Sequence, residues 1–365
     1  MMIIFDLDGT LLNTIDDLGY ACNYALEKAG FPTHPISEYP RMVGNGINNL
    51  IRRALPEADR TEETILRVRS HFVPYYDAHN CDYTRPYEGI PELLQTLKSR
   101  GHQLAVASNK YQAATEKIVT HFFPGVFDVI LGEREGIERK PDPQIVKDIL
   151  AQLHNDPIND QMVLYIGDSL VDRDTAHNAG VPFIACSWGF VPREKLIEAG
   201  VKRIVDRPVE IAKIETYDLL LEQVRSLVSG ESDKIANMAN VSAVLHEAFG
   251  FWWTGFYRVE PNESGVEQLV LGPFQGPVAC TRIPFGKGVC GMAWKEAKTI
   301  IVPDVHQFAG HIACSSESNS EIVVPVFEAD HVTAVLDIDS RDFDTFDQTD
   351  RFYLEQIAQI LSASF

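Results

Sequence analysis

In the first half of the chain, short apolar runs alternate with segments of helical periodicity. Strands separated by helix-length segments predict a parallel, doubly wound, Rossmann-like α/β sheet. The expected strands are Ile3–Phe5, Leu104–Ala107, Val129–Leu131, Val163–Ile166, Phe183–Ala185 and, more weakly, Ile204–Val205. One connection, residues 14–84, has a mostly helical pattern and is far too long for a simple crossover. We interpret this connection as a helical cap inserted into the sheet domain.

The pattern changes after Glu215. Two helical segments come first, then a series of strand-like runs, then a closing helix. In order, they are Leu220–Val228, Val241–Phe249, Trp252–Val259, Glu267–Leu271, Thr299–Val302, Glu321–Val326, Val332–Ile338 and Asp347–Ser362. This order predicts an α+β domain with an antiparallel sheet flanked by helices. We therefore expect two domains, residues 1–215 (core 1–13 and 85–215, cap 14–84) and residues 216–365.

The net charge of the chain limits the partners that it is expected to bind. The 365 residues include 52 acidic residues against 32 Lys and Arg, a net charge of −20. Nucleic acids and anionic membranes need a basic footprint, so we expect neither as a partner. No apolar run approaches the roughly 18 residues of a membrane span. No basic segment precedes an apolar stretch at the N-terminus, so we expect a cytoplasmic protein whose six cysteines are mostly free thiols.

Two acidic residues follow the first expected strand. In Ile3-Ile4-Phe5-Asp6-Leu7-Asp8-Gly9-Thr10, Asp6 and Asp8 lie at the carboxyl end of a buried strand, where open α/β sheets bind ligands. One carboxylate there can attack phosphorus, and the other can protonate the leaving oxygen and later take a proton from water. The pair indicates phosphoryl transfer in which one of the two acids is the nucleophile.

Three later elements, each near the end of an expected strand, supply the other groups that phosphoryl transfer needs. Ser108-Asn109-Lys110 offers a hydroxyl, an amide and an ammonium group to phosphate oxygens, and Lys140 offers a point charge. Asp168 and Asp172 offer carboxylate oxygens to Mg²⁺, which prefers carboxylates together with water and substrate phosphate. These cations offset the charge of an anionic substrate in an acidic protein.

In these four elements, and in their order and spacing, residues 2–214 resemble the haloacid dehalogenase superfamily of phosphatases. The resemblance implies that Asp6 is the nucleophile, that Asp8 is the general acid and base, and that Ser108 and Lys140 bind phosphate. The presence of Asp8 favours phosphatases and phosphomutases over true dehalogenases, which do not need that acid. The Mg²⁺ ligands that the resemblance implies are Asp6, the backbone carbonyl of Asp8, and Asp168, with Asp172 in support.

The cap segment Val43-Gly44-Asn45-Gly46 is similar to that of phosphoglycolate phosphatases. A glycine-flanked Asn can bring backbone N–H groups close to a small anionic substrate. We therefore expect phosphoglycolate as the substrate. A simple turn between helices explains Gly-Asn-Gly equally well, and pyrophosphate or a sugar phosphate remains an alternative substrate.

The second half carries three cysteines and a group of acids. The glycines and prolines around Cys280, Cys290 and Cys314 predict loops, where thiols can reach solvent and substrate. A thiol with a pKa of about 8.5 is mostly protonated at neutral pH, so a reactive cysteine needs an environment that favours its thiolate. The other candidate site residues are Glu321, which follows Asn319-Ser320, the acids Asp337 and Asp339 at alternate positions of one strand, and the aromatic residues Trp253 and Tyr257.

The region from Tyr217 to Phe365 resembles the free methionine-(R)-sulfoxide reductases, which have a GAF-type fold. The resemblance rests on Ile235–Asn240, Trp252–Tyr257, the spacing of the three cysteines, and Leu336–Ser340. It implies that the thiolate of Cys314 attacks the sulfoxide sulfur while a nearby acid protonates the oxygen. The resulting sulfenic acid would condense with Cys290, and a thioredoxin-like dithiol would reduce the disulfide. Cys280 would matter least, or only in that regeneration.

The same resemblance assigns the remaining groups. The acids Glu321, Asp337 and Asp339 suit the substrate's ammonium group or the protonation of its oxygen, and Trp253 and Tyr257 suit its methyl-sulfur end. Two other interpretations of this half stay open. It could be a ligand-binding sensor that regulates the phosphatase, or its cysteines and His311 could form a zinc site.

Overall fold

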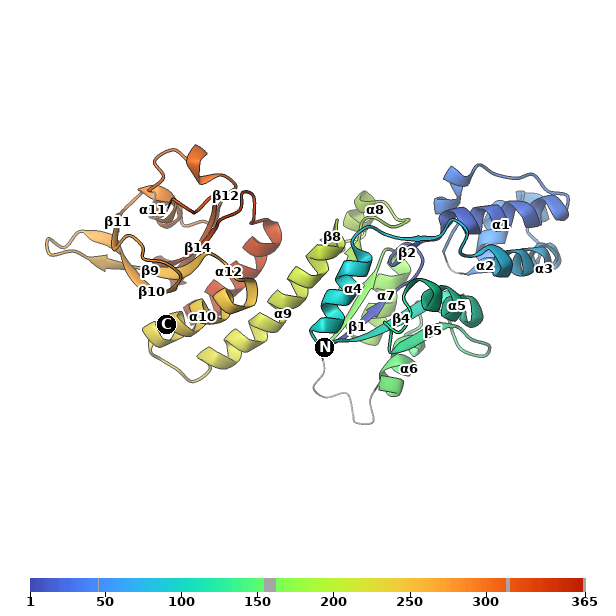
Figure 1. Ribbon diagram of the computed structural model, residues 1–365, viewed down its shortest axis with the longest axis horizontal. Coiled ribbons are helices and arrows are strands. Elements are labelled where there is room, and N and C mark those ends of the chain that lie inside the picture. The colour runs from blue at the N-terminus through green and yellow to red at the C-terminus, as the bar shows by residue number, and fades with distance from the viewer. Residues whose placement is uncertain (45, 154–161, 313–315, 364–365) are drawn as a thin grey trace. The chain divides into compact units, whose positions relative to one another are not determined.

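The chain folds into two compact units, Met1–Ala212 and Lys213–Phe365 (Figure 1). The computed structural model describes residues 1–44, 46–153, 162–312 and 316–363. The division between the units falls inside one continuous helix, α9 (Pro208–Val228), as does the boundary expected after residue 215. Among the described residues, no helix combines the length and the apolar character needed to cross a membrane.

Six parallel strands form the sheet of the first unit, in the order β5-β4-β1-β6-β7-β8. The strands are β1 (Met2–Phe5), β4 (Gln103–Tyr111), β5 (Val129–Glu133), β6 (Val163–Gly167), β7 (Phe183–Cys186) and β8 (Ile204–Val205). Every strand expected in this half is present, and the parallel α/β fold is confirmed. The chain order reverses at β1, which lies between β4 and β6. Such a reversal opens a ligand crevice at the carboxyl ends of the strands.

Helices cover this sheet because its central strands are apolar on both faces, as β1 shows by being buried along its whole length. On α6, Ile145, Val146 and Ile149 follow the spacing of one helical face and join residues of β1 and β4 in a single apolar cluster. The helices are α4 (Ile90–Ser99), α5 (Gln112–Phe122), α6 (Gln144–Leu153), α7 (Leu170–Ala179) and α8 (Arg193–Glu198).

A helical insertion separates β1 from β4, as the sequence predicts. It contains α1 (Ile15–Lys28), η1 (Ile36–Arg41), α2 (Ile47–Ala54), η2 (Glu57–Asp59) and α3 (Glu62–His79). The chain leaves and re-enters the core through two short antiparallel strands, β2 (Leu12–Asn13) and β3 (Arg85–Pro86). Buried Asp17 fixes this crossing, since its Oδ2 accepts hydrogen bonds from Thr84 N at 2.8 Å and Thr84 Oγ1 at 2.7 Å.

The second unit is an antiparallel sheet in the order β11-β10-β9-β14-β13-β12, and the expected α+β class is confirmed. Helix α10 contacts β9 and β10, and α12 contacts β13, whereas α11 contacts β11, β12, β13 and β14. The elements are α10 (Lys234–Phe249), β9 (Trp253–Pro261), β10 (Glu267–Gln275), β11 (Arg282–Pro284), α11 (Gly288–Glu296), β12 (Ile300–Val302), η3 (Val305–Gln307), β13 (Ser320–Glu328), β14 (His331–Ser340) and α12 (Gln348–Ala363).

One prediction of local structure is wrong. The glycines beside Cys290 indicated a loop, but Cys290 lies in the first turn of α11. Gly288 begins this helix with a φ of 63°, a conformation that glycine adopts without strain. Gly291 lets the helix lie close to β11, because a Cβ at this position would stand 2.7 Å from the carbonyl oxygen of Pro284. Gly288 therefore starts the helix, and Gly291 allows its close packing on β11.

Candidate active sites

The first site forms where β1 ends. Asp6 follows the strand directly, and its carboxylate forms a buried group with those of Asp168 and Asp172, in which one oxygen atom from each residue lies within 4.8 Å of the other two. Gly9 makes this approach possible, since a Cβ there would stand 2.4 Å from Asp168 Oδ2. Convergence of the carboxyl ends of β1 and β6 brings these acids together, although more than 160 residues separate them in the chain.

Lys140 lies between two of these acids. Its Nζ is 2.7 Å from Asp6 Oδ1 and 2.7 Å from Asp172 Oδ1. Asn109 holds the Lys140 backbone from both sides, because its Nδ2 donates to Lys140 O at 3.1 Å and its Oδ1 accepts from Lys140 N at 3.0 Å. The amide of Asn109, expected to bind substrate, is thus occupied with positioning the lysine. Burial opposes the charge of Lys140, but Asp172 and Asp6 raise its pKa well above the usual range.

Asp8 has a different lysine as its partner. Lys110 Nζ lies 2.9 Å from Asp8 Oδ1, and the hydroxyl of Thr14 donates to the same oxygen at 2.6 Å. Lys110 also donates to the hydroxyl of Tyr76 at 2.7 Å, which joins the core to cap helix α3. Sequence reasoning missed Tyr76, because a buried tyrosine on a helix gives the same signal as a core residue. It named Lys110 only as a phosphate donor.

The acids of this site repel one another and need a cation. Burial and the neighbouring Asp172 raise the pKa of Asp6 to about 7, although Lys140 opposes the rise. Burial, with Asp172 and Asp6, raises the pKa of Asp168 well above its usual range. A divalent cation would offset both effects. The donor set of clustered carboxylate oxygens fits Mg²⁺. Asp172 Oδ2 is already engaged, since it accepts a hydrogen bond from Ser169 Oγ at 2.6 Å.

The residues expected from the sequence line one cavity of about 350 Å³. Ser108 is among them, and its Oγ accepts a hydrogen bond from Lys110 N at 3.1 Å. The cavity also holds two cations that sequence reasoning missed, Arg53 from the cap and Lys195 from α8. Asn45, the centre of the expected glycine-flanked turn, lies outside the described residues. The expected site residues that line this cavity are Asp6, Asp8, Ser108, Asn109, Lys140, Asp168 and Asp172.

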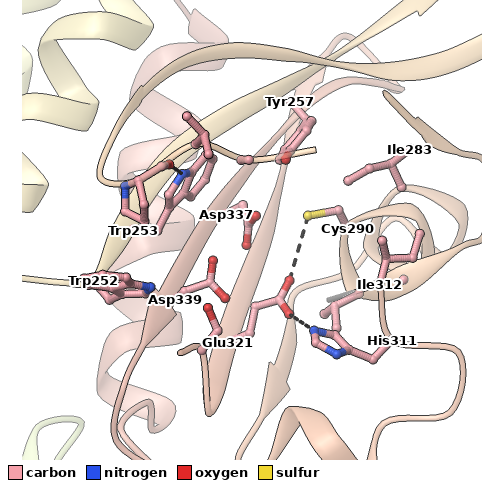
Figure 2. Close-up of a pocket in the computed structure, with 16 residues that line it drawn as sticks. Trp252, Trp253, Tyr257, Ile283, Cys290, His311, Ile312, Glu321, Asp337 and Asp339 are labelled. Atoms are coloured by element: carbon pink, nitrogen blue, oxygen red, sulfur yellow. Dashed lines mark hydrogen bonds and ion pairs between the residues drawn. The ribbon is translucent and has the colours of Figure 1, made fainter. Parts of the chain in front are cut away.

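The second site is a smaller cavity between α11 and the sheet of the second unit. Figure 2 shows Cys290 on the helix facing Glu321, Asp337 and Asp339 on the strands. The sheet register explains this gathering, because Glu321 on β13 pairs with Asp339 on β14, and Asp337 lies two residues earlier on the same face. Cys290 Sγ donates to Glu321 Oε1 at 3.9 Å, and His311 Nε2 lies 3.8 Å from Glu321 Oε2.

The charges of this cavity favour protonated groups. Burial, with Asp337 and Asp339 nearby, raises the pKa of Glu321 well above its usual range. Burial also raises the pKa of Asp337 to about 6 and, together with Asp337, lifts the pKa of Asp339 well above normal. Burial and the adjacent acids Asp337 and Glu321 raise the pKa of the Cys290 thiol strongly. Cys290 is therefore a poor nucleophile in this state.

The two expected aromatic residues form one wall of this cavity. The rings of Trp253 and Tyr257 are stacked with their centroids 5.9 Å apart. Trp253 Nε1 donates to Pro277 O at 3.1 Å, and the hydroxyl of Tyr257 donates to Cys280 O at 3.0 Å. Besides contributing apolar surface, the pair therefore holds the segment that carries Cys280.

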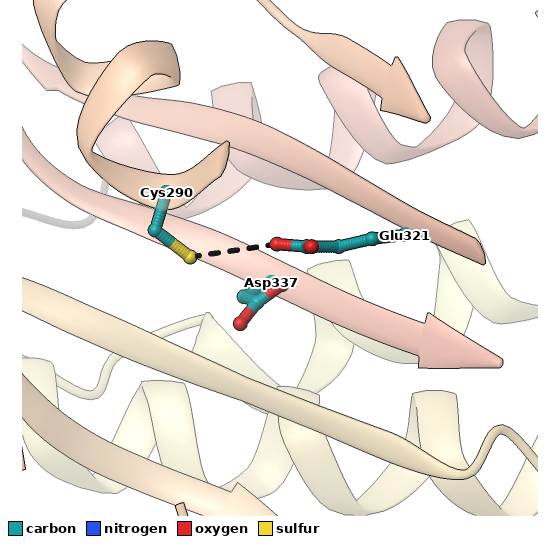
Figure 3. A group of neighbouring side chains, drawn as sticks. All are labelled: Cys290, Glu321 and Asp337. Carbon is teal, nitrogen blue, oxygen red and sulfur yellow. Dashed lines mark hydrogen bonds between the residues drawn. The ribbon is translucent and has the colours of Figure 1, made fainter. Parts of the chain in front are cut away.

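The cysteines differ in oxidation state. Cys280 is disulfide-bonded, whereas the described free cysteines are Cys22, Cys81, Cys186 and Cys290. Cys314, expected to be the nucleophile, lies outside the described residues. The sequence-based interpretation made Cys290 the partner of that nucleophile. In the structure Cys290 is a free thiol enclosed by acids (Figure 3), and Cys280 is disulfide-bonded.

Comparisons with known proteins relate each half of the chain to a different family. Residues 3–186 match the haloacid dehalogenase-like hydrolase family, and residues 240–364 match the GAF domain family. The free methionine-R-sulfoxide reductase of Escherichia coli is 44% identical over 40% of this chain and 86% of its own length. The phosphoglycolate phosphatase of Cereibacter sphaeroides is 33% identical over 52% of this chain and 85% of its own.

A solved structure supports the fold of the first half. A candidate phosphoglycolate phosphatase from Lactobacillus delbrueckii subsp. bulgaricus is 34% identical, with a TM-score of 0.54 over 57% of this chain and 95% of its own.

Proposed function

Because the chain belongs to the haloacid dehalogenase-like hydrolases in its first half and to the GAF-fold free methionine-R-sulfoxide reductases in its second, we propose that it is an enzyme with two activities. The first is hydrolysis of a small phosphomonoester, and the second is reduction of free methionine-(R)-sulfoxide. Each activity has its own cavity and its own reactive groups.

The observation that carries the phosphatase proposal is the separate pairing of the two acids, Asp6 with Lys140 and Asp8 with Lys110. An oxygen of Asp6 attacks phosphorus, and the bond between phosphorus and the ester oxygen breaks. Asp8 gives its proton to the departing oxygen and then takes a proton from water. That water attacks the aspartyl-phosphate, which releases inorganic phosphate and restores Asp6. Ser108 and Lys140 bind the phosphate oxygens.

Mg²⁺ is the proposed cofactor of this site. It would neutralise the charge of the phosphoryl oxygens. The groups that would hold it are the carboxylates of Asp6 and Asp168 and the backbone carbonyl of Asp8, with Asp172 in support through its bonds to Lys140 and Ser169.

Replacing Asp168 with Asn should raise the Mg²⁺ concentration needed for half-maximal phosphatase activity by at least about tenfold. Activity should return at high Mg²⁺, because the nucleophile is intact. The measurement is phosphate release as a function of Mg²⁺ concentration. Asp142→Asn is a suitable control, since the Asp142 side chain binds the backbone of Gln144 outside the cavity. An unchanged Mg²⁺ requirement in Asp168→Asn would remove this residue from the ligand set.

Phosphoglycolate is the proposed substrate. Beyond the phosphate binders, the cavity contains Arg53 and Lys195, either of which suits the substrate's carboxylate. The name of the Cereibacter sphaeroides relative supports the same choice. A screen of small phosphate compounds tests this choice of substrate, and the highest kcat/KM is expected for phosphoglycolate. A higher value for pyrophosphate or a sugar phosphate would make that compound the proposed substrate instead.

The reductase proposal uses Cys314 and Cys280. The thiolate of Cys314 attacks the sulfoxide sulfur. The sulfur is reduced to the thioether of methionine, and the oxygen passes to Cys314 as a sulfenic acid. The thiol of Cys280 then displaces this oxygen as water to give a disulfide, which a thioredoxin-like dithiol reduces. We give Cys280 this role in place of Cys290 because, among the described cysteines, Cys280 is disulfide-bonded and Cys290 is free.

The three acids have the remaining roles, which are to protonate the sulfoxide oxygen and to bind the substrate's ammonium group. Burial and its acidic neighbours raise the pKa of Glu321 well above its usual range, which favours its protonated form, so it can protonate the sulfoxide oxygen. Asp337, whose pKa burial raises to about 6, suits the ammonium group of a free amino acid. Asp339 lies beside it on the same face of β14.

Free methionine sulfoxide should be reduced far faster than the same residue within a peptide. A peptide lacks the α-ammonium group that pairs with the buried acids, and leaving a buried charge without its partner costs on the order of 2–5 kcal/mol, roughly 30- to 5,000-fold. The measurement compares kcat/KM for free methionine-(R)-sulfoxide and for its N-acetylated, amidated form. Equal values would contradict the proposed role of the acids.

The alternative is a sensor domain that regulates the phosphatase. Turnover of free methionine sulfoxide with a dithiol separates the two possibilities. A sensor would bind a ligand and change the phosphatase rate without releasing methionine.

A further inference from the structure

One residue of the cap lines the phosphatase cavity but has no step in the proposed reaction. Tyr76 lies on α3, is 1% exposed, and belongs to the lining of the cavity that also holds Asp8. Its hydroxyl accepts a hydrogen bond from Lys110 Nζ at 2.7 Å, and the same ammonium group lies 4.8 Å from the centre of the Tyr76 ring. Both contacts fix the position of a cation that is itself buried.

Lys110 connects this tyrosine to the proposed general acid. Its Nζ lies 2.9 Å from Asp8 Oδ1, and Thr14 Oγ1 donates to the same oxygen at 2.6 Å. Within the described part of the chain, no hydrogen bond reaches the other oxygen, Asp8 Oδ2. A cation and a hydroxyl donor at Oδ1 favour a proton on Oδ2. The anchored oxygen therefore orients the carboxyl group, and Oδ2 is left to give its proton to the substrate.

The position of Lys110 depends on the hydroxyl of Tyr76. A lysine side chain is flexible, and this one contacts a neutral acceptor on the cap and a carboxylate on the core. Burial, together with Asp8 and Asp17 nearby, raises the pKa of Tyr76 well above its usual range. The hydroxyl therefore stays neutral and does not compete with Asp8 for the charge of the lysine. Proton transfer needs its two heavy atoms at hydrogen-bond distance, so a displaced Lys110 would misplace the acid.

We propose that Tyr76 is a positioning residue for proton transfer by Asp8, acting through the ammonium group of Lys110; this role rests on the phosphatase reaction proposed for the first site. In the first step of that reaction the bond between phosphorus and the ester oxygen breaks. The electron pair stays with that oxygen, and the proton of Asp8 Oδ2 passes to it. Because Tyr76 lies on the cap and Asp8 lies on the core, the acid is held in place only while α3 keeps its contact with Lys110.

Two substrates whose leaving groups differ in their need for a proton test this role. The alkoxide oxygen of phosphoglycolate must be protonated as it departs, whereas para-nitrophenyl phosphate releases a nitrophenolate that departs without a proton. The measurement is kcat/KM of the full-length chain at saturating Mg²⁺, which reports the steps up to release of the leaving group and excludes the later attack by water. Tyr76→Phe removes only the hydroxyl. It should lower kcat/KM roughly 10- to 100-fold for phosphoglycolate, but less than about twofold for para-nitrophenyl phosphate.

The ratio of the two kcat/KM values is measured on one preparation, so a partial loss of folded protein cancels. Tyr75→Phe is the matched control, since Tyr75 is the neighbouring residue on α3 and its ring stacks on Tyr24 within the cap; both of its values should be unchanged. Asp8→Asn should show the same dependence on the leaving group as Tyr76→Phe, with a larger loss. Equal losses with both substrates in Asp8→Asn would refute the general-acid role itself. Equal losses, or none, in Tyr76→Phe alone would overturn only the role of the tyrosine.

A double-mutant cycle tests whether Tyr76 acts through Lys110. Lys110→Met keeps an unbranched side chain but removes the ammonium group that the tyrosine holds. When Tyr76→Phe is added to Lys110→Met, kcat/KM for phosphoglycolate should fall by less than about twofold further, because the connecting group is already gone. A further loss as large as that of Tyr76→Phe alone would show that the hydroxyl acts by another route, and it would overturn the proposal.

Discussion

Asp6→Asn is expected to lower phosphatase activity by at least about 10⁴-fold, since loss of a nucleophile removes the covalent route altogether. The fold should persist. An amide has nearly the shape of a carboxylate, and its oxygen can still accept the hydrogen bond that Lys140 makes to Asp6 Oδ1 at 2.7 Å. The measurement is kcat for phosphate release at saturating Mg²⁺, with far-ultraviolet circular dichroism to confirm folding.

Two controls accompany this variant. Asp174→Asn removes an acid of α7 that pairs with Arg173 outside the cavity, and it should retain full phosphatase activity. Sulfoxide reduction by Asp6→Asn itself should equal that of the unmodified protein, because the reductase residues belong to the other compact unit. Phosphatase activity of Asp6→Asn near the original value would show that another group attacks phosphorus.

The second prediction with a large expected effect concerns the different roles of the three cysteines in sulfoxide reduction. Cys314→Ser should release no methionine even in a single turnover, because a hydroxyl is not deprotonated near neutral pH and attacks sulfur poorly. Cys280→Ser should release one methionine per chain and then stop as a sulfenic acid, since the thiol that resolves it is gone. Cys290→Ser should proceed to the disulfide and continue when a dithiol is present.

A sulfenic-acid probe distinguishes these outcomes. After reaction without reductant, the probe should label Cys280→Ser but neither the unmodified protein nor Cys290→Ser. Cys81→Ser is the control for loss of a thiol, since Cys81 lies in the first unit. Labelling of Cys290→Ser alone would return the resolving role to Cys290, as the sequence-based interpretation had it.

Much of the architecture could be predicted because it depends on local patterns. The apolar runs at Ile3–Phe5 and Val163–Ile166 become β1 and β6, since a buried strand needs apolar residues whatever its partners are. The parallel topology of the sheet then places the residues of the first site. The carboxyl ends of parallel strands meet at one edge of the sheet, so Asp6 and Asp168 could be placed together from the sequence. The alternation of Asp337 and Asp339 likewise predicts one shared face of a strand.

The pairing of charges depended on the tertiary structure. The sequence shows two acids near β1 and two lysines, Lys110 and Lys140, but not which lysine approaches which acid. Near the end of β4, Lys110 contacts Asp8 and Tyr76, and the amide of the adjacent Asn109 holds Lys140 where it contacts Asp6. Such contacts join residues distant in the chain, and no local propensity encodes them.

The second site depended on tertiary structure even more. The sequence by itself determined the strands, the cysteines and the acids as candidate groups, because residue type and period are local properties. Only the sheet register placed Glu321 opposite Asp339. Only the packing of α11 against β11 and β13 buried Cys290 among the acids and left it a free thiol, while Cys280 formed the disulfide. Glycines signal a loop locally, but Gly288 begins a helix with a positive φ, and Gly291 permits that helix to approach β11 closely, which depends on the tertiary packing.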